Sequence, residues 1–172
     1  MTITRVVFSA ALIAAPLTAY AQTPNDAQIA AIVVTANQVD IDAGRLAETK
    51  ARNPQVKAFG KQMVTDHSGV NQQAVALATK LKVTPEDNPT SQSLKAGGAD
   101  NVKKLTGLSG AAFDKAYVDH EVAYHEAVLS AIDKTLIPSA KNEELKALIV
   151  KVRPAFVGHL EHAKMIQAKI KG

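Results

Sequence analysis

Five polar residues of this 172-residue chain stand at positions where helical spacing would place apolar ones. They come from four separate stretches and are Asp40, His67, Glu121, His125 and His159. Imidazoles and carboxylates are the side chains that commonly bind Zn, Fe, Mn or Cu(II). Glu121 and His125 are four residues apart, so a helix places both on one face, where they can chelate one ion. The residue types therefore suit one divalent transition metal.

Glu121 lies near the middle of an apolar face. At about 100° per residue, one face of segment 111–136 collects a set of mainly apolar side chains, namely Tyr117, Val118, Glu121, Val122, His125, Val128, Leu129 and Ile132. A carboxylate in that setting needs a proton, a hydrogen bond, a cation or a metal ion.

Four amphipathic helices must position these residues. Apolar residues recur at three- and four-residue spacing in four segments, which we expect to be helices over 25–52, 54–82, 111–136 and 141–171. Asp40 falls on the apolar stripe of the first helix, His67 on that of the second and His159 on that of the fourth. Pro154 should kink the fourth helix.

Segment 83–110 interrupts the pattern, because glycine, proline, asparagine and serine are frequent in it. We expect a long, mobile connection with room for two short helices, at 91–96 and 99–105. Such a length is unusual in a compact domain unless the connection has to cross the whole bundle. Two helical hairpins joined by one crossover are typical of a ferritin-like four-helix bundle, with the long crossover between helices two and three.

The distances from the predicted turns bring the five polar residues to one level. Asp40 and His67 each stand 13 to 14 residues from Asn53, which corresponds to about 20 Å of helix. His125 lies at a similar depth from Pro138, and Glu121 and His159 lie one to two turns further. We therefore expect all five side chains to meet near the middle of the bundle.

The first residues indicate export. Arg5 precedes the mostly apolar segment 6–18, and Ala19-Tyr20-Ala21 is a small-x-small cleavage signal before Gln22. This pattern predicts a signal peptide over 1–21, a single mature domain over 22–172 and a periplasmic location. No later apolar run approaches the length of a transmembrane span.

The composition narrows the function classes. The net charge is +4, no basic cluster stands out and aromatic residues make up 4%, so nucleic-acid binding has little support. With no cysteine, disulfides and thiolate metal sites are excluded. No nucleophile–base arrangement or phosphate-binding loop points to a hydrolase. The sequence is compatible with a protein partner but does not identify one.

Four runs of residues together resemble a known family, and they are 40–51, 56–68, 113–118 with His125 following, and 159–163. The chain resembles, over nearly its whole mature length, the secreted bacterial family catalogued as domain of unknown function 4142, placed among ferritin-like folds. The resemblance implies the bundle and export but no activity. The family motifs have histidine at His67, His125 and His159, and usually glutamate at Asp40.

The chain departs from iron-oxidising ferritins, which carry Glu-x-x-His on two helices. Here three residues separate Glu121 from His125, and the fourth helix offers His159-x-x-His162 instead. A single-metal site, or no metal, therefore fits better than a di-iron centre.

Two interpretations of the polar residues remain open. The first is a metal-binding or metal-dependent redox protein of the periplasm. The second is a non-catalytic envelope stress or interaction module, whose structural polar core pairs Asp40 with His67 and Glu121 with His159. In either case Asp66 is expected to be an outer partner or solvated, and His120 and His162 are expected at the rim.

Overall fold

The computed structural model describes residues 23–170, and every regular element in that range is a helix. The elements in chain order are α1 (Asp26–Lys50), α2 (Pro54–Leu81), α3 (Pro89–Thr106), α4 (Gly110–Ala131), the π-helix η1 (Ile132–Leu136), α5 (Ile137–Ser139) and α6 (Glu143–Ile170). The predicted all-α class is confirmed. The predicted signal peptide over 1–21 lies outside the described residues.

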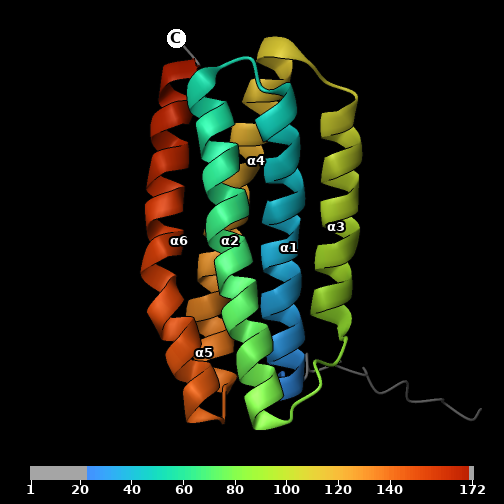
Figure 1. Ribbon diagram of the computed structural model, residues 1–172, viewed down its shortest axis with the longest axis vertical. Coiled ribbons are helices and arrows are strands. Elements are labelled where there is room, and N and C mark those ends of the chain that lie inside the picture. The colour runs from blue at the N-terminus through green and yellow to red at the C-terminus, as the bar shows by residue number, and fades with distance from the viewer. Residues whose placement is uncertain (1–22, 171–172) are drawn as a thin grey trace, which may run out of the picture.

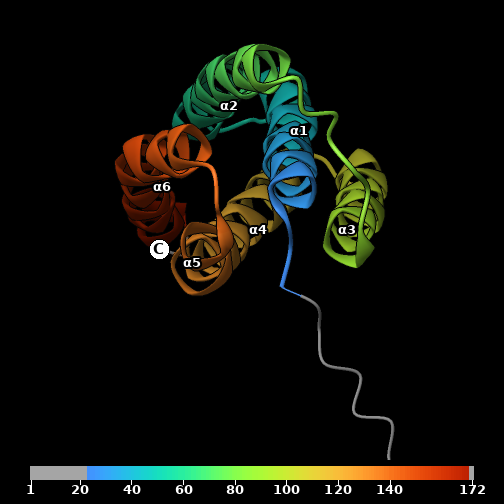
Figure 2. The ribbon, with the colours of Figure 1, turned by 90° about the horizontal axis from the view of Figure 1, so that it is seen from below.

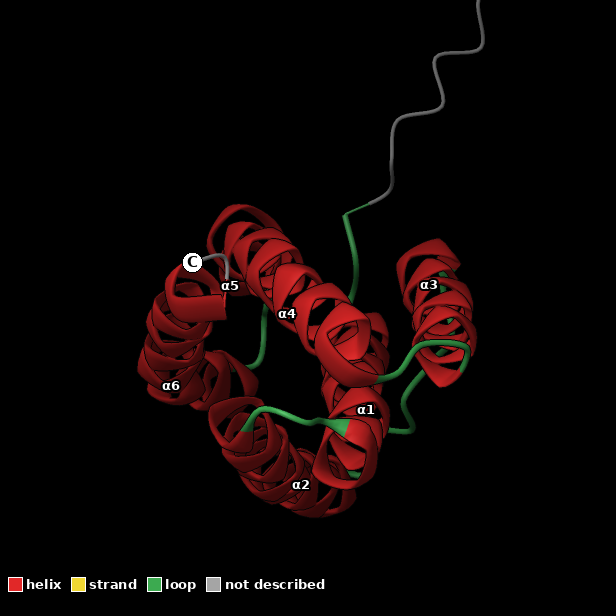
Figure 3. Cartoon of the chain, turned by 90° about the horizontal axis from the view of Figure 1, so that it is seen from above, coloured by secondary structure: helices red, strands yellow, loops and turns green. Residues whose placement is uncertain are grey.

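Four long helices face one another around a common axis, and the fifth lies outside them (Figure 1). α1 packs along α2, α2 along α6, α6 along α4 and α4 along α1. The two end views show this ring, with α3 beside α1 and away from α2 and α6 (Figures 2 and 3). The four helices of the ring are those that the apolar stripes predict.

The segment between the second and third stripes is more ordered than its sequence suggests. Instead of a mobile connection with two short helices, residues Pro89–Thr106 form the single helix α3. Asn88 caps its first turn by accepting hydrogen bonds from Thr90 and Ser91, and Pro89 takes the first helical position, where its missing N–H costs nothing. Packing against α1 then supports a helix that contains two adjacent glycines, Gly97 and Gly98.

Side-chain caps define where the first two helices begin. Asn25 and Asn53 cap α1 and α2 with their side chains, and Pro54 follows the second cap. Asp114 of α4 accepts hydrogen bonds from the backbone N–H groups of Arg52 and Asn53, at 3.0 and 2.9 Å. This carboxylate ties the start of α4 to the α1–α2 turn and so helps to set the axial level of the two hairpins.

Two glycines bring α1 and α2 into close contact. A Cβ on Gly44 would lie 2.8 Å from the carbonyl oxygen of Gly60, and a Cβ on Gly60 would lie 2.6 Å from Cβ of Ala47. Both distances are shorter than real side chains allow, so only glycine permits this spacing. The contact holds the two helices that carry Asp40 and His67 at a fixed separation.

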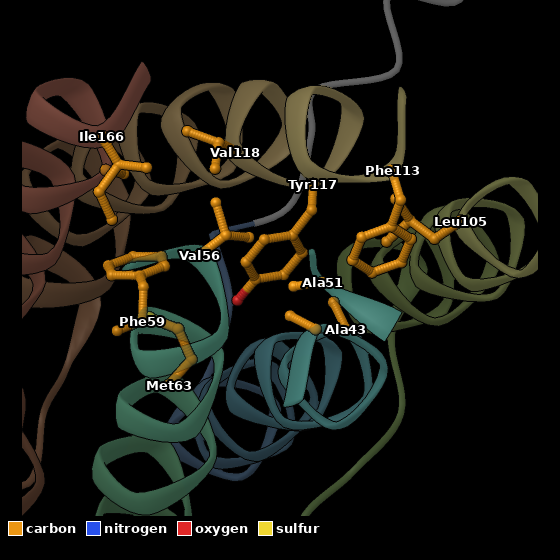
Figure 4. Packing of buried hydrophobic residues seen from close by; sticks show 12 residues of the cluster. Ala43, Ala51, Val56, Phe59, Met63, Leu105, Phe113, Tyr117, Val118 and Ile166 are labelled. Atoms are coloured by element: carbon orange, nitrogen blue, oxygen red, sulfur yellow. The ribbon is translucent and has the colours of Figure 1, made fainter. Parts of the chain in front are cut away.

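The apolar interior is divided into two clusters along the helix axes. One, near the α1–α2 turn, includes Phe59, Phe113 and Tyr117, and the Tyr117 ring lies between the two phenylalanines (Figure 4). The other lies toward the opposite end and includes Ile132 and Phe156. The polar residues of interest fall between the clusters. None of the helices within residues 23–170 combines the length and apolar character needed to cross a membrane.

Candidate metal centre

All five predicted residues are buried inside the ring of helices. Glu121, His125 and His67 are 0% exposed, Asp40 is 1% exposed and His159 is 3% exposed. They come from α1, α2, α4 and α6. Such complete burial removes five polar side chains from water, so each has to find a partner within the protein or a bound ion.

Two overlapping groups of these residues could hold a metal ion. In one group, His67, His125 and His159 each offer a ring nitrogen, and these atoms lie within 4.8 Å of one another. In the other, Asp40, Glu121 and His125 meet the same criterion. Two nitrogens that are each 2.1 Å from one ion lie at most about 4.2 Å apart. The spacing is therefore close to that of a coordination shell.

The three imidazole rings face one another at close range. Their centroids are 5.2 Å apart for His67 and His159, 5.5 Å for His125 and His159, and 5.7 Å for His67 and His125. The Phe156 ring lies 4.9 Å from that of His67 and covers the side toward the second apolar cluster. The rings thus form a compact triangle with an apolar wall.

One nitrogen of His67 is held by an amide. Its Nδ1 lies 2.7 Å from Oδ1 of Asn37. The amide nitrogen of Asn37 donates to the carbonyl oxygen of Val33 at 2.8 Å, which turns the Asn37 oxygen toward the ring. Because that oxygen only accepts, Nδ1 of His67 carries the proton and Nε2 keeps its lone pair.

His125 and His159 follow the same rule. Nδ1 of His125 lies 3.0 Å from the carbonyl oxygen of Glu121, and Nε2 of His159 lies 2.9 Å from Oδ2 of Asp66. Both partners are acceptors, so both of these nitrogens donate. The other nitrogens, Nε2 of His125 and Nδ1 of His159, therefore carry lone pairs. Within residues 23–170, these two atoms and Nε2 of His67 have no hydrogen-bond partner.

The two carboxyl groups lie beside each other and interact, so each affects the pKa of the other. None of the four oxygens of Asp40 and Glu121 is hydrogen-bonded within the part of the chain that the structure describes. The nearest imidazole nitrogens are Nδ1 of His67, 3.4 Å from Asp40, and Nδ1 of His125, 3.5 Å from Glu121. The hydroxyl of Tyr117 is buried beside Glu121 and interacts with its carboxyl group.

Burial shifts the pKa values of these groups toward their neutral forms. It raises the pKa of Glu121 to about 8. It also raises the pKa of Asp40 well above its usual range, with a further rise from the charge of Glu121. For His67 and His159, burial lowers the pKa, and for His125 it lowers the pKa to about 4. Neutral imidazoles are the form that binds metals.

The hydrogen-bond partners of the buried histidines differ in part from the pairs that the sequence predicts. His159 contacts Asp66, whereas the expected Glu121–His159 pair is wrong because Glu121 approaches His125 of its own helix. Asp66, at the surface with 41% of its side chain exposed, takes the predicted role of an outer partner. Asn37 was not predicted, although its place one turn before Asp40, on the same buried face, is a signal that the sequence contains.

A surface pocket of about 400 Å³ reaches the triangle of rings between α2 and α6. Its wall includes His67, His159 and Asp66, with Lys151 and Gln73 at the rim. The Lys151 ammonium donates to the Gln73 side chain at 3.0 Å. This pocket brings solvent close to the rings of His67 and His159.

Comparison with known protein families identifies the family of the chain. A family model described as a domain of unknown function (DUF4142) matches residues 13–166. No curated protein and no solved structure matches the chain significantly.

Proposed function

Since the chain belongs to the family of domain of unknown function DUF4142, whose description names no activity, we propose a function from the site. The protein binds one divalent transition metal. His67, His125 and His159 supply the nitrogen ligands. In the alternative group, Asp40 and Glu121 supply carboxylate oxygens together with one nitrogen of His125, since both carboxyl groups lie on the Nδ1 side of His67 and His125. Zn, Fe, Mn and Cu(II) all accept such a mixed set of ligands.

One observation carries this proposal. Each of the three imidazoles has one nitrogen fixed to an oxygen acceptor, leaving the other nitrogen with a lone pair and without a partner. Three buried acceptors without a donor are unfavourable in the metal-free protein, whereas a cation bound by the three rings would satisfy them. An outer oxygen that orients a histidine is the usual support of metal-binding imidazoles.

The carboxyl groups complete the charge balance. Ionised Asp40 and Glu121 would offset the two positive charges of a divalent ion, and the ion in turn would favour their ionised forms. A bound metal would supply Lewis-acid or redox chemistry, depending on its identity. The chain's own contribution is to hold the three imidazoles neutral, buried and oriented, beside the pocket that Asp66 lines.

The test compares thermal stability with and without metal. Chelator-treated protein is melted alone and with Zn, Mn, Fe or Cu, and an ion that binds only the folded state raises the midpoint. His125→Ala should lose that gain, while His162→Ala, which alters a histidine bonded to Gln62, should keep it. A wild-type midpoint that none of the four ions raises would exclude the metal site.

The second candidate function is a non-catalytic envelope stress or interaction module with a structural polar core. It is favoured by the raised pKa values of Asp40 and Glu121, which allow two neutral carboxyl groups to share the interior. In that case His125→Ala lowers the melting temperature equally with and without metal, because it removes a buried group of a fixed network. The same melting experiment therefore distinguishes the two functions.

Export and the finer architecture complete the proposal. The protein is periplasmic after cleavage before Gln22, and residues 22–172 form one ferritin-like domain in which two helical hairpins are joined by a crossover containing α3. The order of the helices and the helical crossover support this arrangement. The intact mass of protein from a periplasmic extract tests export. Recovery of chains that retain Met1 from the membrane fraction would contradict it.

A further inference from the structure

A second cavity lies beside the triangle of imidazoles, on the far side of Phe156. It has a volume of about 320 Å³ and is bounded by residues of all five long helices and of η1, including Ile32, Val128, Ile132, Leu136, Ile149 and Phe156. Two further lining residues, Thr90 of α3 and Ala127 of α4, are exposed. The cavity therefore opens to solvent between α3 and α4.

The polar groups in its wall are few, and two of the three are already bonded elsewhere. Asn37 is engaged with Val33 and His67. The Tyr124 hydroxyl donates to the carbonyl oxygen of Ala36 at 3.1 Å. The third, Thr90, stands at the mouth. No charged side chain lines the cavity, so a molecule inside it would find neither a counter-ion nor a deep hydrogen-bond partner.

Small side chains keep this space open. Ala36 and Ala131 line it at positions where leucine or methionine would fill part of the volume. Protein interiors are packed nearly as densely as organic crystals, and an apolar hole is destabilising in proportion to its volume. A closed apolar hole stays dry and takes up apolar guests, and one of about 150 Å³ holds benzene. This cavity is about twice that volume.

The local backbone adds a second, independent observation. Ile132 and Leu136, which line the cavity, are the first and last residues of the π-helix η1. π-helical turns are rare and occur frequently at functional sites. Here the irregular turn follows α4 at the level of the cavity and continues into α5.

We propose that this cavity is a binding site for one small, uncharged, apolar molecule of about ten carbon atoms, such as a fused aromatic ring pair or a medium-length alkyl chain. The molecule enters between α3 and α4 and lies against Phe156, which separates it from His67. The site does not depend on a bound metal, because none of the five proposed ligands lines the cavity.

The probe is 1-aminonaphthalene, titrated into the folded, full-length mature protein near pH 7.5 while its fluorescence is followed. We expect saturation at one probe per chain and displacement by naphthalene. Naphthalene-1-sulfonate should bind at least tenfold more weakly, because its charge would enter a wall without a counter-ion. Removal of metal by a chelator should leave the probe affinity unchanged, which separates this result from the fate of the metal site.

Two variants reduce the cavity volume independently. Ala131→Leu and Ala36→Leu should each weaken probe binding at least tenfold, whereas Ala123→Phe, at an exposed position on α4 outside the cavity wall, should leave it unchanged. If one filling variant does not fold, the other and the sulfonate comparison decide. Absence of saturable binding to the wild type, equal binding of the sulfonate, or wild-type affinity in a folded filling variant would overturn the proposal.

Discussion

Asn37 Oδ1 lies 2.7 Å from Nδ1 of His67, and this contact decides which nitrogen of the ring is free. The amide itself is oriented by its bond to Val33, so the chain from backbone carbonyl to amide to imidazole has only one consistent set of donors and acceptors. A residue that is not a proposed ligand thus controls the direction of a lone pair at the centre of the site.

Replacing Asn37 should therefore weaken metal binding without removing a ligand. In Asn37→Leu the His67 ring loses the acceptor that holds its tautomer and orientation, and we expect metal affinity to fall by about 10- to 100-fold. Isothermal titration of the chelator-treated protein measures the change. Gln38→Ala, which removes a side chain bonded to the exposed Asp42, is the matched control and should bind as the wild type does. Unchanged affinity in Asn37→Leu would remove Asn37 from the site.

The buried carboxyl groups make the metal-free protein sensitive to alkali. The pKa of Glu121 is about 8 in the folded state, well above that of an exposed glutamate, so between these values the folded state holds a proton that the unfolded state has lost. The free energy of unfolding then falls as pH rises. Between pH 6.5 and 8 the loss from this carboxyl should be about 1 to 2 kcal/mol.

Denaturant unfolding of chelator-treated protein at several pH values measures this slope. Asp40, whose pKa is also raised, should steepen the fall of the free energy of unfolding with pH. Glu121→Gln should make it shallower, because the amide does not titrate. Below pH 6.5 the histidines act in the opposite sense, since their lowered pKa values let the unfolded state bind more protons. Stability of the stripped wild type that is constant from pH 6.5 to 8 would contradict the assignment.

The close approach of α1 and α2 should not tolerate a methyl group. In Gly60→Ala the new Cβ would lie 2.6 Å from Ala47 and 2.9 Å from the Gly44 carbonyl oxygen, so the helices have to separate. We expect a loss of about 1 to 3 kcal/mol in the free energy of unfolding. Gly69→Ala in the same helix meets nothing within 4 Å and should stabilise by up to about 1 kcal/mol. Equal effects of the two substitutions would mean that the contact is looser than described.

α3 should be protected from hydrogen exchange, but less than the helices of the ring. Its amides are helical, yet it packs mainly on α1 and lies outside the ring (Figure 3). Local opening of such an element requires less free energy than global unfolding. Mass-spectrometric exchange should therefore rank 83–88 fastest, Pro89–Thr106 intermediate and the buried turns of α1 slowest. Exchange of α3 as fast as that of 83–88 would indicate that the helix forms only transiently.

The sequence alone located the helices and the polar residues within them. Helical periodicity is a local property, so the stripes of α1, α2, α4 and α6 could be counted along the chain, and Asn53 followed by Pro54 marked the first turn. Asp40, His67, Glu121, His125 and His159 could be assigned to buried faces and to a common level for the same reason. Their role as ligands stays a prediction.

Tertiary structure decided what the local pattern does not contain. α3 reads as a connection because Gly97 and Gly98 weaken its helix propensity, yet a Cβ on Gly98 would lie 2.7 Å from Val39, so the glycine allows the helix to approach α1. Likewise, the pairing of His159 with Asp66 depends on how α2 and α6 are rotated about their axes. Spacing along one helix fixes the face on which a side chain lies, but only packing between helices determines which side chain it meets.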